Sequence, residues 1–195
     1  MDISEKKNAL KTFINNNKTT ILEHKYDDLY ASWAFDAKYL TQLLIDANVD
    51  LFKYLTNIPA ASIPKDYKMS DIGGNIKFID DYAFAGNTTI TDLRVHEGVD
   101  QINRYAFTSV VRLERIILPE SLTYIGRFAF NDCINLKSVT IQSHECEIDA
   151  YAFRGCKNLK TISCTADIYA KYFKNLDDAK YIGIENLDNI EFYLM

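Results

Sequence analysis

The feature that most constrains this chain is a repeat with a period of 23 residues. An isoleucine column marks it at equal intervals, at Ile79, Ile102, Ile125 and Ile148. Three columns follow in each unit: an aromatic residue (Tyr82, Tyr105, Phe128, Tyr151), then alanine (Ala83, Ala106, Ala129, Ala152), then phenylalanine (Phe84, Phe107, Phe130, Phe153). A fixed period in this range indicates a solenoid, in which each turn buries its apolar side against its neighbours.

Each unit continues with three apolar residues that place alternate side chains of a short strand on one face. The triplets are Ile90, Leu93, Val95; Leu113, Ile116, Leu118; Leu136, Val139, Ile141; and Leu159, Ile162, Cys164. The phenylalanine column is expected to form an inner spine, with a burial gain of roughly 1.5 to 3 kcal/mol per ring. Ile72 and Ile76 fit the end of a degenerate earlier unit, so the array is expected to begin near Ser70.

The segment from Leu118 to Ile141, LPESLTYIGRFAFNDCINLKSVTI, resembles the BspA-type, or Treponema pallidum-type, leucine-rich repeat. The resemblance extends over about Ile72 to Ile168. It implies a solenoid with one strand per repeat that binds proteins or cell surfaces, and it implies no catalytic residues.

The expected architecture is an α+β fold, a short leucine-rich-repeat solenoid of about four 23-residue repeats with a cap at each end. Residues 1–66 carry helical apolar stripes and are assigned to a helical N-terminal cap. Residues 67–168 form the repeats, and residues 169–195 form a C-terminal cap of helix and strands. Caps are expected because a repeat array otherwise exposes an apolar cross-section at each end.

In the C-terminal cap, a helical stripe that includes Tyr172 and Phe173 follows Asp167, which is predicted to be the N-cap. Beyond it, Ile182 and Ile184 and then the alternating apolar residues of 190–194 are predicted to form a strand pair. The apolar end of this segment is expected to be buried in the cap or against a second chain. A homodimer through the C-terminal segment is therefore one option.

Composition argues against several classes of function. The net charge is −5, with 27 acidic and 22 basic residues and no long run of either sign, so no direct nucleic-acid partner is expected. No segment is apolar enough for a signal peptide or a membrane span, so no membrane partner and a cytoplasmic location are expected. His24, His96 and His144 have no partner at metal-binding spacing, and Gly73-Gly74 lacks the pattern of a phosphate loop. No catalytic residue, metal or cofactor is predicted.

The four cysteines form no Cys-x-x-Cys pair and are expected to be reduced thiols. Cys133 and Cys156 share a column one period apart, and strand spacing would bring their backbones within disulfide range. Packing as small core residues is the favoured interpretation, and a disulfide between turns is the alternative.

Opposite charges are expected to meet across neighbouring turns, in the pairs Asp81 with Arg104, Asp92 with Arg115, and Glu114 with Lys137. Exposed pairs of this kind contribute about 0 to 1 kcal/mol each. They are expected to favour the register of the strands more than to mark a ligand.

The outward strand face is the candidate binding surface, although an ordinary solvated surface would have the same composition. The candidate partner-binding residues are Asp92, Arg94, His96, Arg115, Ile117, Thr140, Gln142 and Ser163. Four strands give an area on the order of 200 Å², against roughly 800 Å² per partner in a standard interface. The N-terminal cap, the C-terminal strands or a second copy must therefore contribute to binding.

The sequence predicts a non-enzymatic protein–protein interaction module that docks on a partner protein through its repeat face and N-terminal cap. Two alternatives stay open: a small virus- or mobile-element-encoded inhibitor of a host defence protein, and a structural component of a larger assembly such as a virion.

Overall fold

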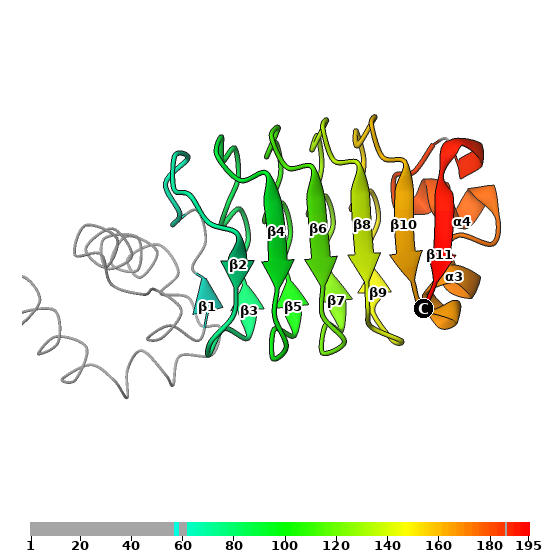
Figure 1. Cartoon of the computed structure of the whole chain (residues 1–195), viewed down its shortest axis with the longest axis horizontal. Helices are drawn as coiled ribbons and strands as arrows, with labels where there is room; N and C mark the ends of the chain where they lie inside the picture. The colour runs from blue at the N-terminus through cyan, green and yellow to red at the C-terminus, as the bar shows by residue number, and fades with distance from the viewer. Residues whose placement is uncertain (1–56, 59–61, 186) are drawn as a thin grey trace, which may run out of the picture.

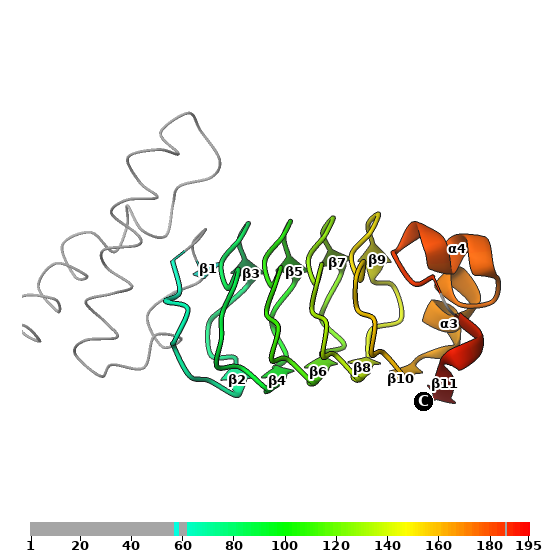
Figure 2. The same ribbon diagram turned by 90° about the horizontal axis from the view of Figure 1, so that it is seen from above.

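The computed structural model describes residues 57–58, 62–185 and 187–195. They form a β-solenoid whose turns stack along one axis, with a sheet on each of two opposite sides (Figures 1 and 2). Most of the helical cap expected over residues 1–66 lies outside the described residues. No described helix has the length and apolar character that crossing a membrane requires.

The larger sheet has six parallel strands, one from each successive turn and one from the C-terminal segment. In spatial order they are β11 (Glu191–Leu194), β10 (Thr161–Cys164), β8 (Ser138–Ile141), β6 (Arg115–Leu118), β4 (Asp92–Val95) and β2 (Asp71–Ile72). Between β4 and β10 each residue pairs with the residue 23 positions further along, as Arg115 does with Ser138. The 23-residue period is thus the register of this sheet.

The smaller sheet lies on the opposite side and has five parallel strands of two residues each. In order they are β1 (Asn57–Ile58), β3 (Phe78–Ile79), β5 (Gln101–Ile102), β7 (Tyr124–Ile125) and β9 (Glu147–Ile148). The isoleucine of every strand is buried, so this column forms one wall of the core. β1 falls inside the segment that the sequence assigns to the N-terminal cap, so the sheet begins before residue 67.

Two stacked columns of rings connect the turns. The phenylalanine column is buried, and the ring centroids of Phe84 and Phe107 are 4.8 Å apart with nearly parallel planes. Beside it the aromatic column stacks in the same way, at 4.8 Å between Tyr82 and Tyr105. All four residues of the aromatic column have φ between 57° and 60°, which lets the chain turn sharply before the buried Ala and Phe.

The C-terminal cap contains α3 (Ala166–Tyr172), α4 (Leu176–Tyr181) and a 3₁₀ turn over Leu187–Asn189. The N-cap of α3 is Thr165, whose hydroxyl accepts a hydrogen bond from the Ile168 N–H, so the prediction of Asp167 as N-cap is wrong. Asp167 lies in the first helical turn, where a carboxylate interacts favourably with the helix dipole.

The strand pair predicted around residues 182–194 is also wrong. Ile182 and Ile184 follow α4 and form no strand, whereas β11 pairs in parallel with β10 as one more strand of the sheet. Tyr181 and Ile182 instead cap the solenoid, because their carbonyls accept hydrogen bonds from the Tyr151 and Phe153 N–H groups at 2.8 and 2.9 Å. In earlier turns the corresponding acceptors belong to the next repeat, as when the Phe130 N–H donates to the Ala152 carbonyl.

Candidate protein-binding face

The candidate site is the outer face of the six-stranded sheet. Strand residues alternate between the buried core and this face, so β6 exposes Arg115 and Ile117 and buries Ile116 and Leu118. The predicted columns exist as expected, since Asp92 pairs with Arg115 and Arg94 pairs with Ile117. Thr140 and Ser163 continue the second column.

Three residues that the prediction omitted extend this face. Asp71 on β2 precedes Arg94 in its column, while Glu191 and Tyr193 on β11 follow Thr161 and Ser163. The apolar alternation of residues 190–194 signals a strand, and its parallel position beside β10 is the part that the sequence pattern did not reveal. With six strands the face measures about 300 Å², which is still below a standard interface.

One half of the face carries charge, and we call it the charged half: Asp71, Asp92, Arg94, His96 and Arg115. Its charges are largely paired. His96 Nε2 lies 2.9 Å from Asp71 Oδ1, and the Arg115 guanidinium donates to the Asp92 carboxylate. A hydrogen bond from the Ser70 hydroxyl, followed by the His96 contact, lowers the pKa of Asp71. The Arg115 hydrogen bond likewise lowers the pKa of Asp92.

The other half is mostly uncharged, and we call it the neutral half: Ile117, Ser138, Thr140, Gln142, Thr161, Ser163 and Tyr193. Glu191, at the start of β11, is a charged residue at its edge. Among the described residues, the hydroxyls of Ser138, Thr140, Thr161 and Ser163 make no hydrogen bond. They are only half-buried and therefore available to a partner. Tyr193 is 52% exposed and ends the second column.

The predicted charge pairs between turns are confirmed. Arg104 Nη2 lies 3.0 Å from Asp81 Oδ2, and Lys137 Nζ lies 2.8 Å from Glu114 Oε2, in addition to the Asp92–Arg115 pair. All of these side chains are exposed except that of Asp81, which is 29% exposed. They are small contributions to register rather than parts of a desolvated site.

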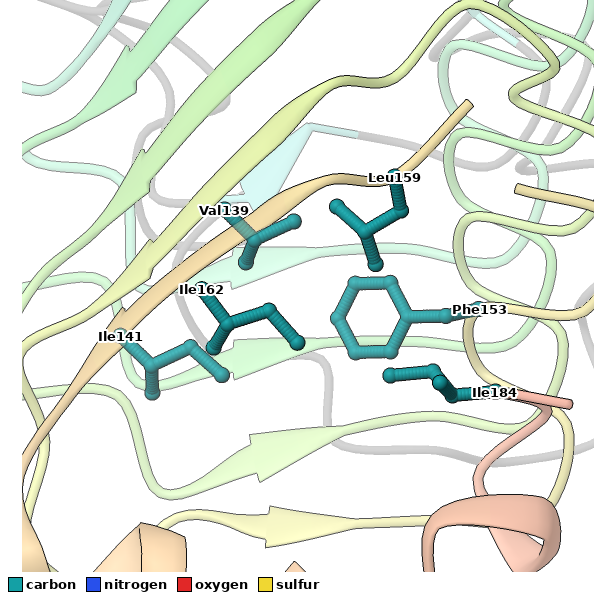
Figure 3. Close-up of a pocket in the computed structure, with 6 residues that line it drawn as sticks. All are labelled: Val139, Ile141, Phe153, Leu159, Ile162 and Ile184. Atoms are coloured by element: carbon teal, nitrogen blue, oxygen red, sulfur yellow. The ribbon is translucent and has the colours of Figure 1, made fainter. Parts of the chain in front are cut away.

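One small apolar gap lies between the last turns of the solenoid. Figure 3 shows this gap between the last turns, and six apolar side chains line it: Val139, Ile141, Phe153, Leu159, Ile162 and Ile184. It is too small for a water molecule. Across the described part of the chain, no three His, Cys, Asp or Glu side chains are grouped as metal ligands.

The cysteines are free thiols in the structure, as the packing interpretation predicts. The Cys133 and Cys156 Sγ atoms lie 3.2 and 3.3 Å from the Phe107 and Phe130 carbonyl oxygens, to which each thiol donates. Burial raises the pKa of Cys133 to about 12. A thiol in this environment is a core group, because the reactive thiolate form is strongly disfavoured.

Comparison with known proteins agrees with this geometry. A model of the BspA type leucine-rich repeat region matches residues 77–194 with six copies, which is more than half of the chain. The chain belongs to the BspA-type leucine-rich repeat family. Proteins built from such repeats generally mediate protein–protein interactions and are typically non-enzymatic. A search of curated protein sequences finds no match.

Three solved structures match part of the chain. A leucine-rich cell surface protein from Faecalibacterium prausnitzii is 17% identical, with a TM-score of 0.41 over 63% of this chain and 37% of its own. The pneumococcal vaccine antigen PcpA is 18% identical, with a TM-score of 0.40, and the match covers 75% of this chain and 45% of the antigen. A leucine-rich repeat protein from Bacteroides ovatus is 23% identical, with a TM-score of 0.32, and the match covers 56% of this chain and 35% of that protein. The chain covers less than half the length of each of these proteins.

Proposed function

We propose that this chain is a non-enzymatic module that docks a partner protein on the outer face of the six-stranded sheet, centred on the neutral half. The observation that carries the proposal is the group of unpaired hydroxyls on β8 and β10 between Ile117 and Tyr193. Hydroxyl groups cost less to desolvate than charged groups, and the paired charges on one side of the neutral half suit the polar rim of an interface.

Capture of a partner with the full chain, followed by calorimetric titration of variants, tests the location of the site. Thr140→Arg places a long charged side chain at the proposed centre and should weaken binding at least tenfold, an effect of about 1.4 kcal/mol. Gln101→Arg is the matched control, because it places the same side chain on the outer side of the five-stranded sheet. Equal affinities for the two variants would place the site elsewhere.

We also propose that residues 1–66 contribute to docking, because a face of about 300 Å² is smaller than the roughly 800 Å² of a standard interface. Replacing residues 1–56 by a neutral cap keeps β1 and should weaken binding. Full affinity in that version would mean that the repeats suffice.

Arg94→Ala with Arg115→Ala tests the charged half, where a small effect is expected from rim positions.

We place this activity in the cytoplasm, a proposal supported by four free cysteines. The narrower roles of an inhibitor of a host defence protein or a virion component would use the same face. The identity of the captured partner decides between them.

A further inference from the structure

A ridge of rings and guanidiniums borders the five-stranded sheet. Each ring of the aromatic column lies three positions after the buried isoleucine of β3, β5, β7 or β9, and these strands lie side by side (Figure 1). We call the rings and the arginines beside them the aromatic ridge: Tyr82, Arg104, Tyr105, Arg127, Phe128, Tyr151 and Arg154. The five-stranded sheet is opposite the six-stranded sheet (Figure 2), so the ridge is a surface separate from the proposed docking face.

The rings of the ridge present their edges rather than their faces. Successive ring centroids are 4.8, 5.0 and 5.4 Å apart, with neighbouring planes within 16° of parallel. The rings therefore cover one another, and only the two end rings have a face that no other ring of the column covers. The end residues Tyr82 and Tyr151 are 45% and 41% exposed. A ring edge carries partial positive charge, so the ridge attracts negative groups and offers few ring faces for nucleic-acid bases to stack on.

Two arginines of the ridge have no acidic partner. The Arg127 guanidinium carbon lies 5.2 Å from the centroid of the Phe128 ring and 5.8 Å from that of the Tyr151 ring. The Arg154 guanidinium carbon lies 5.9 Å from the same Tyr151 centroid. Both arginines are exposed, and within the described residues neither forms an ion pair. Two positive charges without a partner therefore meet at one exposed ring.

Every acid in the turns that carry the ridge (residues 80–86, 103–109, 126–132 and 149–155) already has a hydrogen-bond partner. The pairs are Asp80 with Asn103, Asp81 with Arg104, Asp132 with Asn131, and Asp149 with Tyr124 and Tyr181. These turns contain no excess of positive charge, which a long polyanion such as nucleic acid requires. The free guanidiniums of Arg127 and Arg154 instead favour a ligand with a few carboxylates.

We propose that the aromatic ridge binds an extended segment of a partner protein with acidic residues at alternate positions, whose carboxylates contact Arg127 and Arg154. Side chains at alternate positions of an extended chain point the same way and are about 7 Å apart. Two of them can therefore reach both guanidiniums beside Tyr151. A guanidinium donates paired hydrogen bonds to a carboxylate, and the positive ring edges add a favourable contact.

The length and rigidity of the ridge suit such a segment. The centroid separations give a length of about 15 Å, which about five extended residues span. Stacking already holds the rings in place, so they lose little side-chain freedom on binding. Within the described residues the hydroxyls of Tyr82, Tyr105 and Tyr151 make no hydrogen bond. They are available to the backbone carbonyls of the segment.

An NMR titration of the full isotope-labelled chain with the peptide Ser-Glu-Ser-Glu-Ser, blocked at both ends, tests the proposal. The amides of Tyr105, Phe128 and Tyr151 should shift and saturate, with a dissociation constant of about 1 mM or lower. The amides of Thr140 and Ser163 on the six-stranded sheet should not move. Ser-Gln-Ser-Gln-Ser is the matched peptide and should cause no saturating shift, because it lacks the carboxylates.

Two charge variants test the role of the free guanidiniums. Arg127→Gln with Arg154→Gln removes both and should weaken binding of Ser-Glu-Ser-Glu-Ser by about fivefold or more. Arg112→Gln with Lys160→Gln removes the same charge from exposed positions before β6 and β10, and its expected effect is below about twofold because distant charges are screened. Thermal melting verifies that both variants fold.

Three results would each overturn the proposal. The first is the absence of a saturating shift of the ridge amides with Ser-Glu-Ser-Glu-Ser, and the second is equal affinity of the two charge variants for this peptide. The third is binding of inorganic phosphate as tight as that of the peptide, because the ridge would then be a site for small anions. All three concern the ridge alone and leave the proposed docking on the six-stranded sheet unaffected.

Discussion

At the scale of the residue, each column of the repeat has its own structural role. The sequence predicted the buried Phe and Ala columns, because apolar residues at a fixed period must face the core. It did not predict the positive φ of Tyr82, Tyr105, Phe128 and Tyr151, since glycine or asparagine is the usual signal for that conformation. The left-handed conformation costs about 1 to 2 kcal/mol per residue, and stacking of the rings along the column helps to offset it.

The phenylalanine spine gives the first prediction. Phe130→Ala should lower the free energy of unfolding by about 3 to 5 kcal/mol, because the ring is fully buried and stacks on Phe107 and Phe153 at 5.2 and 5.3 Å. Thr140→Ala, on the sheet face, should change it by less than about 0.5 kcal/mol. Urea titration followed by circular dichroism measures both variants. Similar midpoints would contradict the stacking model.

The thiols give a second prediction at the same scale. Burial raises the pKa of Cys133 and Cys146 to about 12, and that of Cys156 well above its usual value. Native protein at neutral pH should therefore react slowly with Ellman's reagent, since the thiolate is the reactive form. After denaturation without reductant all four cysteines should titrate. A result of two thiols would instead support the disulfide between Cys133 and Cys156.

At the scale of the element, the structure departs most from the sequence-based prediction in the C-terminal cap. Apolar alternation correctly indicated that Phe192 and Leu194 belong to a strand, but the same signal at Ile182 and Ile184 was misleading. Those two isoleucines bury their side chains without strand pairing, while the segment's carbonyls accept hydrogen bonds from the last turn. Periodicity reports which side chains are buried, and it does not report where the backbone hydrogen bonds go.

The close approach of this capping segment gives the third prediction. Gly183 has φ +94°, and a Cβ atom there would lie 2.5 Å from the Arg154 backbone nitrogen. Gly98 is a matched control with φ +101°, where the only near atom is the flexible end of Lys77 at 3.5 Å. Gly98→Ala should cost about 1 to 2 kcal/mol from backbone strain alone. Gly183→Ala should cost at least about 1 kcal/mol more, measured by denaturant unfolding, and equal costs would argue against close packing at the cap.

At the scale of the whole molecule, the 23-residue interval specified the register of both sheets from β2 to β10, because parallel strands in successive turns are related by one period. β1 and β11 pair at offsets of 21 and 30 residues. The prediction of about four repeats was too low, since six strands form the larger sheet. The outermost strands come from degenerate segments that lack the full set of columns. The candidate binding face could be located by alternation alone. The 23-residue columns also separate the charged residues of the first turns from the neutral residues of the later ones. The addition of Asp71, Glu191 and Tyr193 required the pairing of β2 and β11, which spacing did not reveal.

The last prediction follows from this one-dimensional construction. Deletion of Val110–Asp132 removes one complete period of 23 residues, so that Cys133 takes the place of Val110 and every later column keeps its register. Phe153 should then stack on Phe107, and the protein should still unfold cooperatively. Its free energy of unfolding should be lower, and its m value should be smaller because less surface is buried. Deletion of Val110–Ala129 is the control, because it shifts the columns by three residues and places polar side chains in the core. Circular dichroism, together with the denaturant m value, distinguishes the two. If both deletions fold equally well, or if the one-period deletion does not fold, nearest-neighbour stacking of interchangeable turns is not what stabilises this chain.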